Sequence, residues 1–347
     1  MYSESDLDTA VTAGAISAEA AQAFRAHVAR ERHAPAVDEE HFRLLTGFND
    51  IFVSIALVLL LVAVGQIGDT IATYLSGAFV AAAAWMLAIV FTARRRMALP
   101  SIILLGAFVG GVAFSIATTL TTLVLSAAPN SGDERTTAIV TALAGLGAAA
   151  AAWLHWRRFM VPITVAAGAC AVAALVLGTV LAIAPGLQAA IWPLLFVAGL
   201  AMFALAMRWD LSDPARRTRR ADVAFWLHLA AAPMIAHPVF QLLGVFGENS
   251  GIDTALAALV LYAVFGFVAL AVDRRALLVS SLVYVLFAMG SLFRTAGAVE
   301  LSAALTALVI GAALLSLSVF WHPMRRRVVG LLGKAGRRLP PVEMAAA

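Results

Sequence analysis

The chain alternates between long apolar blocks and short polar segments rich in arginine. Each apolar block holds roughly 20 residues, the length that an α-helix needs to cross ~30 Å of hydrocarbon. The pattern predicts ten spans, at residues 48–67, 71–93, 99–127, 136–153, 160–184, 187–207, 222–246, 252–272, 276–293 and 299–321. We therefore expect an all-α polytopic integral membrane protein with about ten transmembrane helices.

The arginines between the spans predict the orientation of the chain. With ten spans, all 24 lysines and arginines except Arg135 and Arg294 fall on one side of the membrane. Cytoplasmic segments carry an excess of these residues, so the N-terminus and the C-terminus are both predicted to be cytoplasmic. Arginine greatly outnumbers lysine and alanine runs are frequent, which is typical of GC-rich bacterial genomes. We expect a multi-pass protein of the bacterial cytoplasmic (inner) membrane.

Composition agrees with this fold class and argues against nucleic acid binding as the function. Hydrophobic residues make up 62% of the chain and charged residues 13%, against about 25% charged residues in soluble domains. The net charge of +4 does not indicate nucleic acid binding, because the arginines occur as short clusters between spans. The one cysteine, Cys170, lies in a predicted span and forms no internal disulfide.

The polar segment 1–43 is predicted to form a cytosolic helical hairpin and a charged linker. It lacks the apolar h-region of a secretory signal, so no cleaved signal peptide is expected. Gly14 is placed to end the first helix and Ser17 to cap the second. The segment is either a solvated tail or a docking element for a cytosolic protein partner.

The transmembrane domain is predicted to cover residues 44–323, and a basic tail follows at 324–347. Val328, Val329, Leu331 and Leu332 alternate with cationic clusters in this tail. An amphipathic segment on the inner leaflet, held by anionic lipids, fits this pattern. A disordered basic tail fits it equally well.

The seventh span holds the strongest candidates for a polar site. It opens with Asp222 and carries His228 and His237, and ionisable residues at membrane depth usually face the interior of a helix bundle. Pro233 and Pro238 each remove one backbone donor, which predicts a broken helix that lines a polar cavity. The two histidines are candidates for ligand binding or a proton relay. The alternative is that they make structural hydrogen bonds.

Helical geometry limits what this span can bind. His228 and His237 are nine residues apart, about 180° around an ideal helix and roughly 13 Å along it. They are therefore not expected to share a metal ion. Asp222 is a further ligand candidate, and its alternative role is to cap the helix and pair with Arg219 or Arg220.

The third span carries a row of hydroxyl groups. Ser115, Thr118, Thr119 and Thr122 lie on one helical face, and Gly106–Gly110 forms a GxxxG motif with Gly111 beside it. Small residues at this spacing let helices approach closely. Helix packing is one interpretation, and a hydroxyl-lined pathway with Thr118 and Thr122 as site residues is the other.

The first span opens with a polar pair, Asn49 and Asp50, which is a further candidate for a ligand site or a helix cap.

No phosphate loop, GxGxxG, HExxH, GxSxG or CxxC motif is present in the sequence. The sequence therefore predicts no catalytic residue, metal site or cofactor, and it does not favour an enzyme.

The N-terminal hairpin carries a short motif, formed by Gly14, Ile16, Ser17 and Glu19. With a many-span domain after it, this motif resembles uncharacterised bacterial membrane proteins whose short N-terminal helical hairpin has a Gly-x-Ile-Ser/Thr-x-Glu core. The resemblance implies no activity. In span count alone, the layout is also similar to the drug/metabolite transporter superfamily.

Two functional hypotheses follow. The first is a transporter or permease-like protein with a polar site near the proline-broken seventh helix, since discontinuous helices build the sites of many transporters. The second is a non-transporting membrane scaffold or sensor that uses the cytosolic N-terminal hairpin.

Overall fold

The computed structural model describes residues 4–31, 48–127, 133–213, 218–244, 252–275 and 301–333, with further positions at 277, 278, 282, 284–286, 289, 290, 293 and 339. All regular secondary structure within these residues is helical. The prediction of an all-α chain is confirmed for this part of the molecule.

The N-terminal segment forms two short helices, α1 (Glu4–Thr12) and α2 (Ala18–Glu31). Gly14 follows α1 with a φ of 71°, a left-handed conformation that glycine adopts without steric cost. The Ser17 hydroxyl accepts a hydrogen bond of 3.0 Å from the backbone N–H of Ala20 and so caps α2. Both helices belong to a compact unit separate from the unit that holds all later helices.

The second unit contains the apolar helices. Their bounds are α3 (Phe48–Ile71), α4 (Thr73–Ala88), the π-helix η1 (Ile89–Arg94), α5 (Ala98–Ala127), α6 (Glu134–Phe159), α7 (Ile163–Ile183), the 3₁₀ helix η2 (Pro185–Ala190), α8 (Ile191–Leu211), α9 (Arg219–Leu242), α10 (Ile252–Val272), α12 (Ser302–Val319) and α13 (Trp321–Leu331).

Among the described residues, seven helices are long and apolar enough to cross a membrane. An eighth span results if α12 and α13, which meet at a bend of 77°, are counted together. These helices are consistent with a polytopic helical membrane protein. The predicted ninth span, at 276–293, lies largely outside the described residues, so the number of ten spans stays a prediction.

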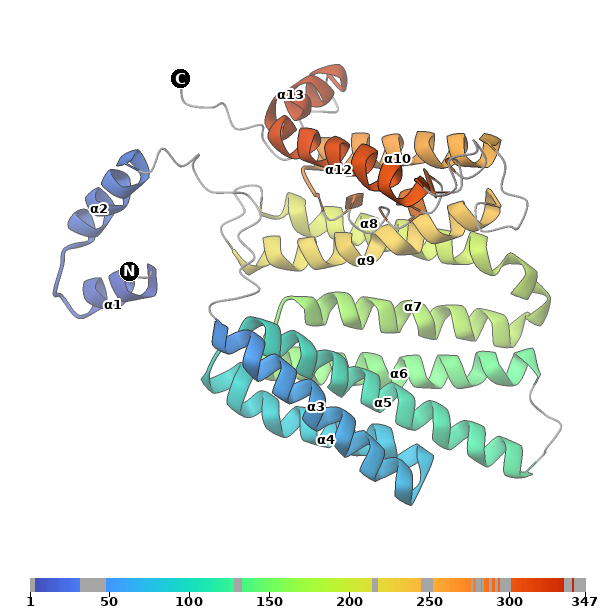
Figure 1. Ribbon diagram of the computed structural model, residues 1–347. Coiled ribbons are helices and arrows are strands. Elements are labelled where there is room, and N and C mark those ends of the chain that lie inside the picture. The colour runs from blue at the N-terminus through green and yellow to red at the C-terminus, as the bar shows by residue number, and fades with distance from the viewer. Residues whose placement is uncertain are drawn as a thin grey trace. The chain divides into compact units, whose positions relative to one another are not determined.

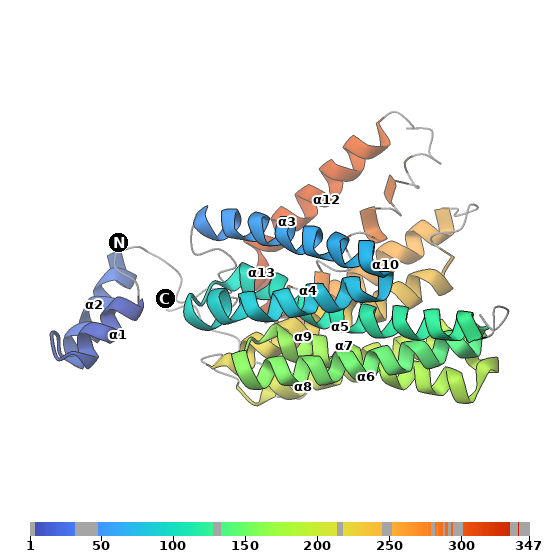
Figure 2. The same ribbon diagram turned by 90° about the horizontal axis from the view of Figure 1, so that it is seen from below.

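Helices that follow one another in the chain mostly pack side by side. The helices α3, α4 and α5 pack together, α5 packs on α6, α6 on α7, and α7 on α9, while α8 and α9 form a close pair. Figures 1 and 2 show α6, α7, α8 and α9 as neighbouring helices in both views. Beyond α9, buried side chains of α10 and α13 complete the packing.

Glycines allow the closest helix crossing between α4 and α5. A Cβ added at Gly77 would lie 2.4 Å from the Gly111 carbonyl oxygen, and one added at Gly111 would lie 2.6 Å from the Gly77 carbonyl oxygen. A Cβ at Gly106 or Gly110 would meet no atom within 4 Å. The packing interpretation of this group of glycines is therefore not met at Gly106 and Gly110, but it holds at Gly111. The neighbouring Gly111 makes the contact, because it faces α4.

The arginine-rich segments gather at one end of the second unit. The helices α6, α8 and α10 end there, and α7 and α9 begin there (Figure 1). We call this end the basic end. Several of its arginines belong to helices rather than to loops, since α6 continues to Phe159 and α9 begins at Arg219. This extension brings charged side chains into the helix packing.

Candidate functional site

Three ionisable side chains meet inside the basic end. Asp210 lies in the last turn of α8, His228 lies on α9, and Arg274 follows α10 directly. The His228 Nε2 atom lies 2.8 Å from Asp210 Oδ2. Arg274 donates from Nε to Asp210 Oδ2 at 3.2 Å and from Nη2 to Asp210 Oδ1. We call these three residues the charge cluster.

The charge cluster is shielded from solvent. The side chains of Asp210, His228 and Arg274 are 1%, 0% and 2% exposed. Arg274 Nη2 also lies 3.3 Å from the Ala221 carbonyl oxygen, which provides a further acceptor. Buried ions persist only when they are paired and hydrogen-bonded, and the two-pronged contact between guanidinium and carboxylate meets this requirement.

Small residues on α9 make room for this cluster. Ala224, Ala231 and Ala232 are fully buried on the face of α9 that packs inward. Small side chains let neighbouring helices approach closely in membrane proteins. The ring of Phe203 on α8 lies edge-on to the His228 ring, with 5.2 Å between the ring centroids. His228 is therefore held between an apolar ring and a carboxylate.

A second buried ion pair adjoins the charge cluster. Asp273 has a φ of 61°, and this turn directs Asp273 and its neighbour Arg274 to different partners. The Trp321 Nε1 atom donates to Asp273 Oδ1 at 2.8 Å, and Arg325 Nε lies 3.3 Å from the same oxygen. We call these contacts the α13 clamp. Residues 273 and 274 thus join α13 to the α8–α9 pair.

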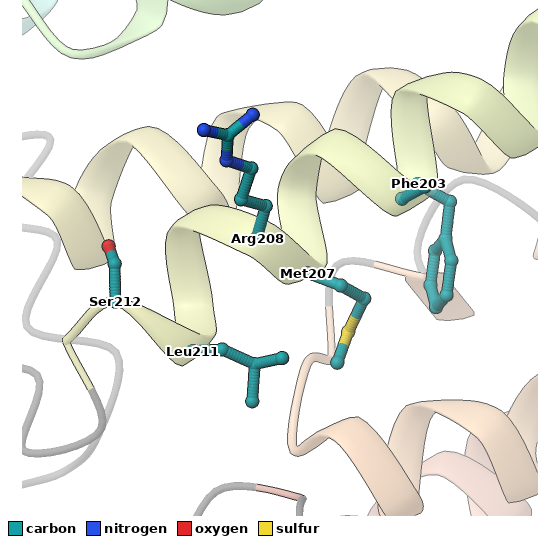
Figure 3. Close-up of a pocket in the computed structure, with 6 residues that line it drawn as sticks. Phe203, Met207, Arg208, Leu211 and Ser212 are labelled. Atoms are coloured by element: carbon teal, nitrogen blue, oxygen red, sulfur yellow. The ribbon is translucent and has the colours of Figure 1, made fainter.

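An open groove runs along one face of α8 at the basic end. Its volume is about 700 Å³, and its described lining residues are Phe203, Ala204, Met207, Arg208, Leu211 and Ser212. Figure 3 shows Phe203 and Met207 on one side of the α8 ribbon and the Arg208 guanidinium on the other. Phe203 therefore belongs to the groove and also contacts His228.

His237, the second predicted histidine, lies in a different environment. Its Nδ1 atom is 3.1 Å from the hydroxyl oxygen of Tyr284, and its ring lies edge-on to Trp192 with 5.1 Å between centroids. The side chain is half-buried. The two histidines of α9 have separate partners, as their spacing predicted, and the structure does not bring them together.

The predicted break in the seventh span is wrong. The helix α9 runs without interruption from Arg219 to Leu242 and contains both Pro233 and Pro238. Proline at 238 cannot donate to the Met234 carbonyl, but α8 approaches that carbonyl closely at Gly199. A Cβ added there would lie 2.9 Å from the Met234 oxygen. The helix therefore continues through both prolines while it packs closely on α8.

Asp222 lies in the first turn of α9, close to the charge cluster. It is half-buried, and its electrostatic environment includes attraction by Arg274 and Arg219 and repulsion by Asp213. The cap of α9 is Thr218, whose hydroxyl accepts from the Arg220 backbone N–H at 3.3 Å. The alternative role of Asp222 as the helix cap is therefore wrong.

The remaining predicted site residues lie apart from the charge cluster. Asn49 is exposed and Asp50 is 3% exposed, both at the start of α3. The Thr118 hydroxyl donates to the Phe114 carbonyl of its own helix at 2.8 Å, and Thr122 is exposed. Ser115 donates to the Tyr74 carbonyl on α4 at 2.8 Å, which is a packing contact.

Sequence reasoning missed four of the five charged residues that form the charge cluster and the α13 clamp. Arg274 and Arg325 were counted among the cations that set the orientation, and Asp210 and Asp273 were assigned to segments between spans. The available signal was the position of both acids at or just after the end of an apolar helix, with an arginine within two residues. An acid in the last turn of an apolar helix needs a partner, because desolvation is costly there.

A further buried histidine lies at the end of α6. His155 is fully buried, and its Nδ1 atom lies 3.1 Å from the Thr164 hydroxyl on α7. Trp85, Phe108 and Phe159 surround the ring, with centroid distances of 6.4, 6.1 and 4.7 Å. No hydrogen-bond partner of Nε2 occurs among the described residues. This aromatic setting makes His155 a packing residue that joins α6 to α7.

Known proteins do not identify this chain. Comparisons with protein-family models, with curated proteins and with solved structures found no significant match.

Proposed function

We propose that the protein is a transporter or permease-like protein of the bacterial inner membrane, with ten spans, cytoplasmic termini and the charge cluster as its polar site. One observation carries the proposal. A carboxylate, an imidazole and a guanidinium are buried together at the end of three apolar helices. Ionisable groups in such positions are costly and typically mark ion or substrate pathways.

The charge cluster can respond to protons or to a charged solute. The charges of Asp210 and Arg274 cancel, so protonation of His228 adds one uncompensated positive charge in a site with little water. Further ionisable groups nearby are Asp222, Asp213 and Arg219, and Asp222 is attracted by Arg274 and Arg219 and repelled by Asp213. A gained charge in this environment favours rearrangement or binding of an anion.

The groove on α8 offers a route toward the charge cluster. Its volume of about 700 Å³ lies within the range of small-molecule sites, about 300–1,000 Å³. Phe203 separates the groove from His228, since its ring contacts the histidine directly. Phe203 is thus shared by the groove and the surroundings of the charge cluster.

The proposal is tested by a binding screen on the purified full-length protein. Melting temperatures are measured with a panel of organic anions, organic cations and neutral solutes at mildly acidic and neutral pH. We expect at least one solute class to stabilise the wild type in a pH-dependent manner. His228→Gln, which keeps a hydrogen-bonding amide but cannot titrate, should abolish the pH dependence.

The matched control is His322→Gln, because His322 is exposed on α13. This variant should retain the pH-dependent stabilisation of the wild type. Equal stabilisation of the wild type and of His228→Gln at both pH values would show that the charge cluster is not the binding site.

A scaffold or sensor is the second candidate function. It is favoured by the separate compact unit that holds α1 and α2, because a domain that folds by itself can dock a cytosolic protein. Deletion of residues 1–43 should then leave the melting temperature unchanged and abolish capture of a partner from a lysate. Capture that persists after the deletion would exclude this candidate.

A further inference from the structure

The helix α13 is unlike the spanning helices. It covers only Trp321–Leu331 and meets α12 at an angle of 77°. A helix at this angle to the helix before it does not continue that helix's direction. Figure 1 shows α13 leaving the end of α12 in a different direction.

One face of α13 is fixed to the rest of the second unit. Trp321 and Arg325 are 2% and 1% exposed, and both contact Asp273 through the α13 clamp. The Arg275 guanidinium lies over the Trp321 ring at 5.0 Å from its centroid. These contacts leave the opposite face of α13 exposed, and we call it the outside face.

The outside face is cationic with an apolar edge. At about 100° per residue, Arg326 and Arg327 lie about 140° and 240° around the helix from Trp321. Both arginines are exposed. Met324 and Leu331 follow at about 300° and 280° and are 40% and 81% exposed. The helix thus has an anchored face, a cationic face and a narrow apolar edge.

We propose that α13 is a membrane-surface helix that binds anionic phospholipids. Arg326 and Arg327 contact the negatively charged headgroups, and Met324 and Leu331 enter the boundary of the acyl region. Interfacial helices combine cations and apolar side chains in this manner. The sequence continues with Lys334, Arg337 and Arg338, which extends the complementarity to an anionic surface.

The apolar edge favours a lipid over a free anion. A free phosphate ion would be attracted by the arginines but would leave Leu331, at 81% exposure, in water. A phospholipid surface satisfies the charge and also covers the apolar edge. The loss of each arginine is expected to lower the equilibrium constant for binding to the anionic surface by about fivefold.

The test places a fluorescent probe on the apolar edge of the full-length protein. Cys170→Ala removes the one cysteine of the chain, and Leu331→Cys provides a unique site for an environment-sensitive dye. The labelled protein is reconstituted into vesicles of phosphatidylcholine alone or of phosphatidylcholine with phosphatidylglycerol. We expect emission at shorter wavelength in the vesicles with phosphatidylglycerol, because the dye then lies in the acyl boundary.

Two sets of variants complete the test. Arg326→Gln with Arg327→Gln should reduce the surface-bound fraction by more than tenfold, since two cations are lost. The matched control is Arg94→Gln with Arg95→Gln, exposed arginines at the end of η1, which should leave the emission unchanged.

The proposal is overturned if the emission is the same in both kinds of vesicle. It is also overturned if inorganic phosphate alone produces the same shift in detergent, because a small-anion site would then explain the arginines. Either result would leave the transporter proposal unaffected, since α13 and the charge cluster are probed separately.

Discussion

At the scale of single residues, the basic end depends on the Asp210–Arg274 pair. Both side chains are at most 2% exposed and join α8 to the turn after α10. Removal of one partner from such a pair leaves a buried charge without compensation, whereas removal of both leaves none. Replacement of either residue alone is therefore expected to destabilise the protein much more than replacement of both.

We predict that Asp210→Asn and Arg274→Gln each destabilise the protein by about 3 kcal/mol. The double variant should recover most of this loss, giving a large coupling energy in a double-mutant cycle. Chemical unfolding in detergent measures the three values. The control is Arg95→Gln, an exposed arginine, which should change stability little. Additive losses in the double variant would contradict the pairing.

His155 provides a second prediction. Thr164→Val removes the partner of the His155 Nδ1 atom, and a buried polar atom without a partner costs about 1–3 kcal/mol. The combined His155→Phe and Thr164→Val variant removes both polar groups from an aromatic environment and should restore stability to the wild-type level. Thermal unfolding decides between the outcomes. If the double variant is less stable than Thr164→Val, the histidine has a role beyond packing.

The sequence identified some of these residues but not their partners. An apolar block of 20 residues can be recognised from its composition, and so can a histidine such as His228 within it. Its partner Asp210 lies 18 positions away, and Arg274 bonds to Asp210 across 64 positions. Hydrogen bonds across such separations depend on how helices pack. The same limit applies to Asp273, whose positive φ directs it to Trp321 on α13.

At the scale of helices, close crossings are determined by individual glycines. The sequence offers many small-residue pairs in the third span, and pattern alone does not tell which of them faces a neighbour. In α5 the glycine that faces the neighbouring helix is Gly111, which packs against the backbone of Gly77 on α4. Likewise, the prolines of α9 predicted a break, but α9 continues through both of them and packs closely on α8 at Gly199.

We predict that Gly77→Ala destabilises the protein by about 1–3 kcal/mol, because its Cβ would lie 2.4 Å from the Gly111 carbonyl oxygen and force the helices apart. Gly106→Ala should instead be neutral or stabilising by about 0.5–1 kcal/mol, since a Cβ there meets no atom within 4 Å. Melting temperatures of the two variants provide the comparison. Equal effects would show that α4 and α5 do not cross at Gly77.

At the scale of the whole molecule, the arginines have two roles that the sequence alone does not separate. Most of them support the orientation prediction, but Arg274 and Arg325 are buried in ion pairs. The orientation prediction does not depend on these two, because most of the remaining cations still fall on one side of the ten predicted spans. Length and hydropathy predicted the apolar helices well, since these properties are local.

The topology prediction can be measured directly. With ten spans and cytoplasmic termini, a fluorescent protein fused after Ala347 should fluoresce in intact bacteria, whereas alkaline phosphatase at the same position should be inactive. Fusions placed after Gly244, which follows α9, should show the opposite behaviour. An active phosphatase at the C-terminus would contradict a cytoplasmic C-terminus.

The central claim is that the charge cluster serves binding rather than stability. It is tested most directly by replacing all three residues together, as Asp210→Leu, His228→Phe and Arg274→Met. Buried ion clusters can often be replaced by apolar residues without loss of stability. We predict a melting temperature equal to or above that of the wild type, with complete loss of the pH-dependent, solute-induced stabilisation. Retention of that stabilisation in the triple variant would contradict the claim.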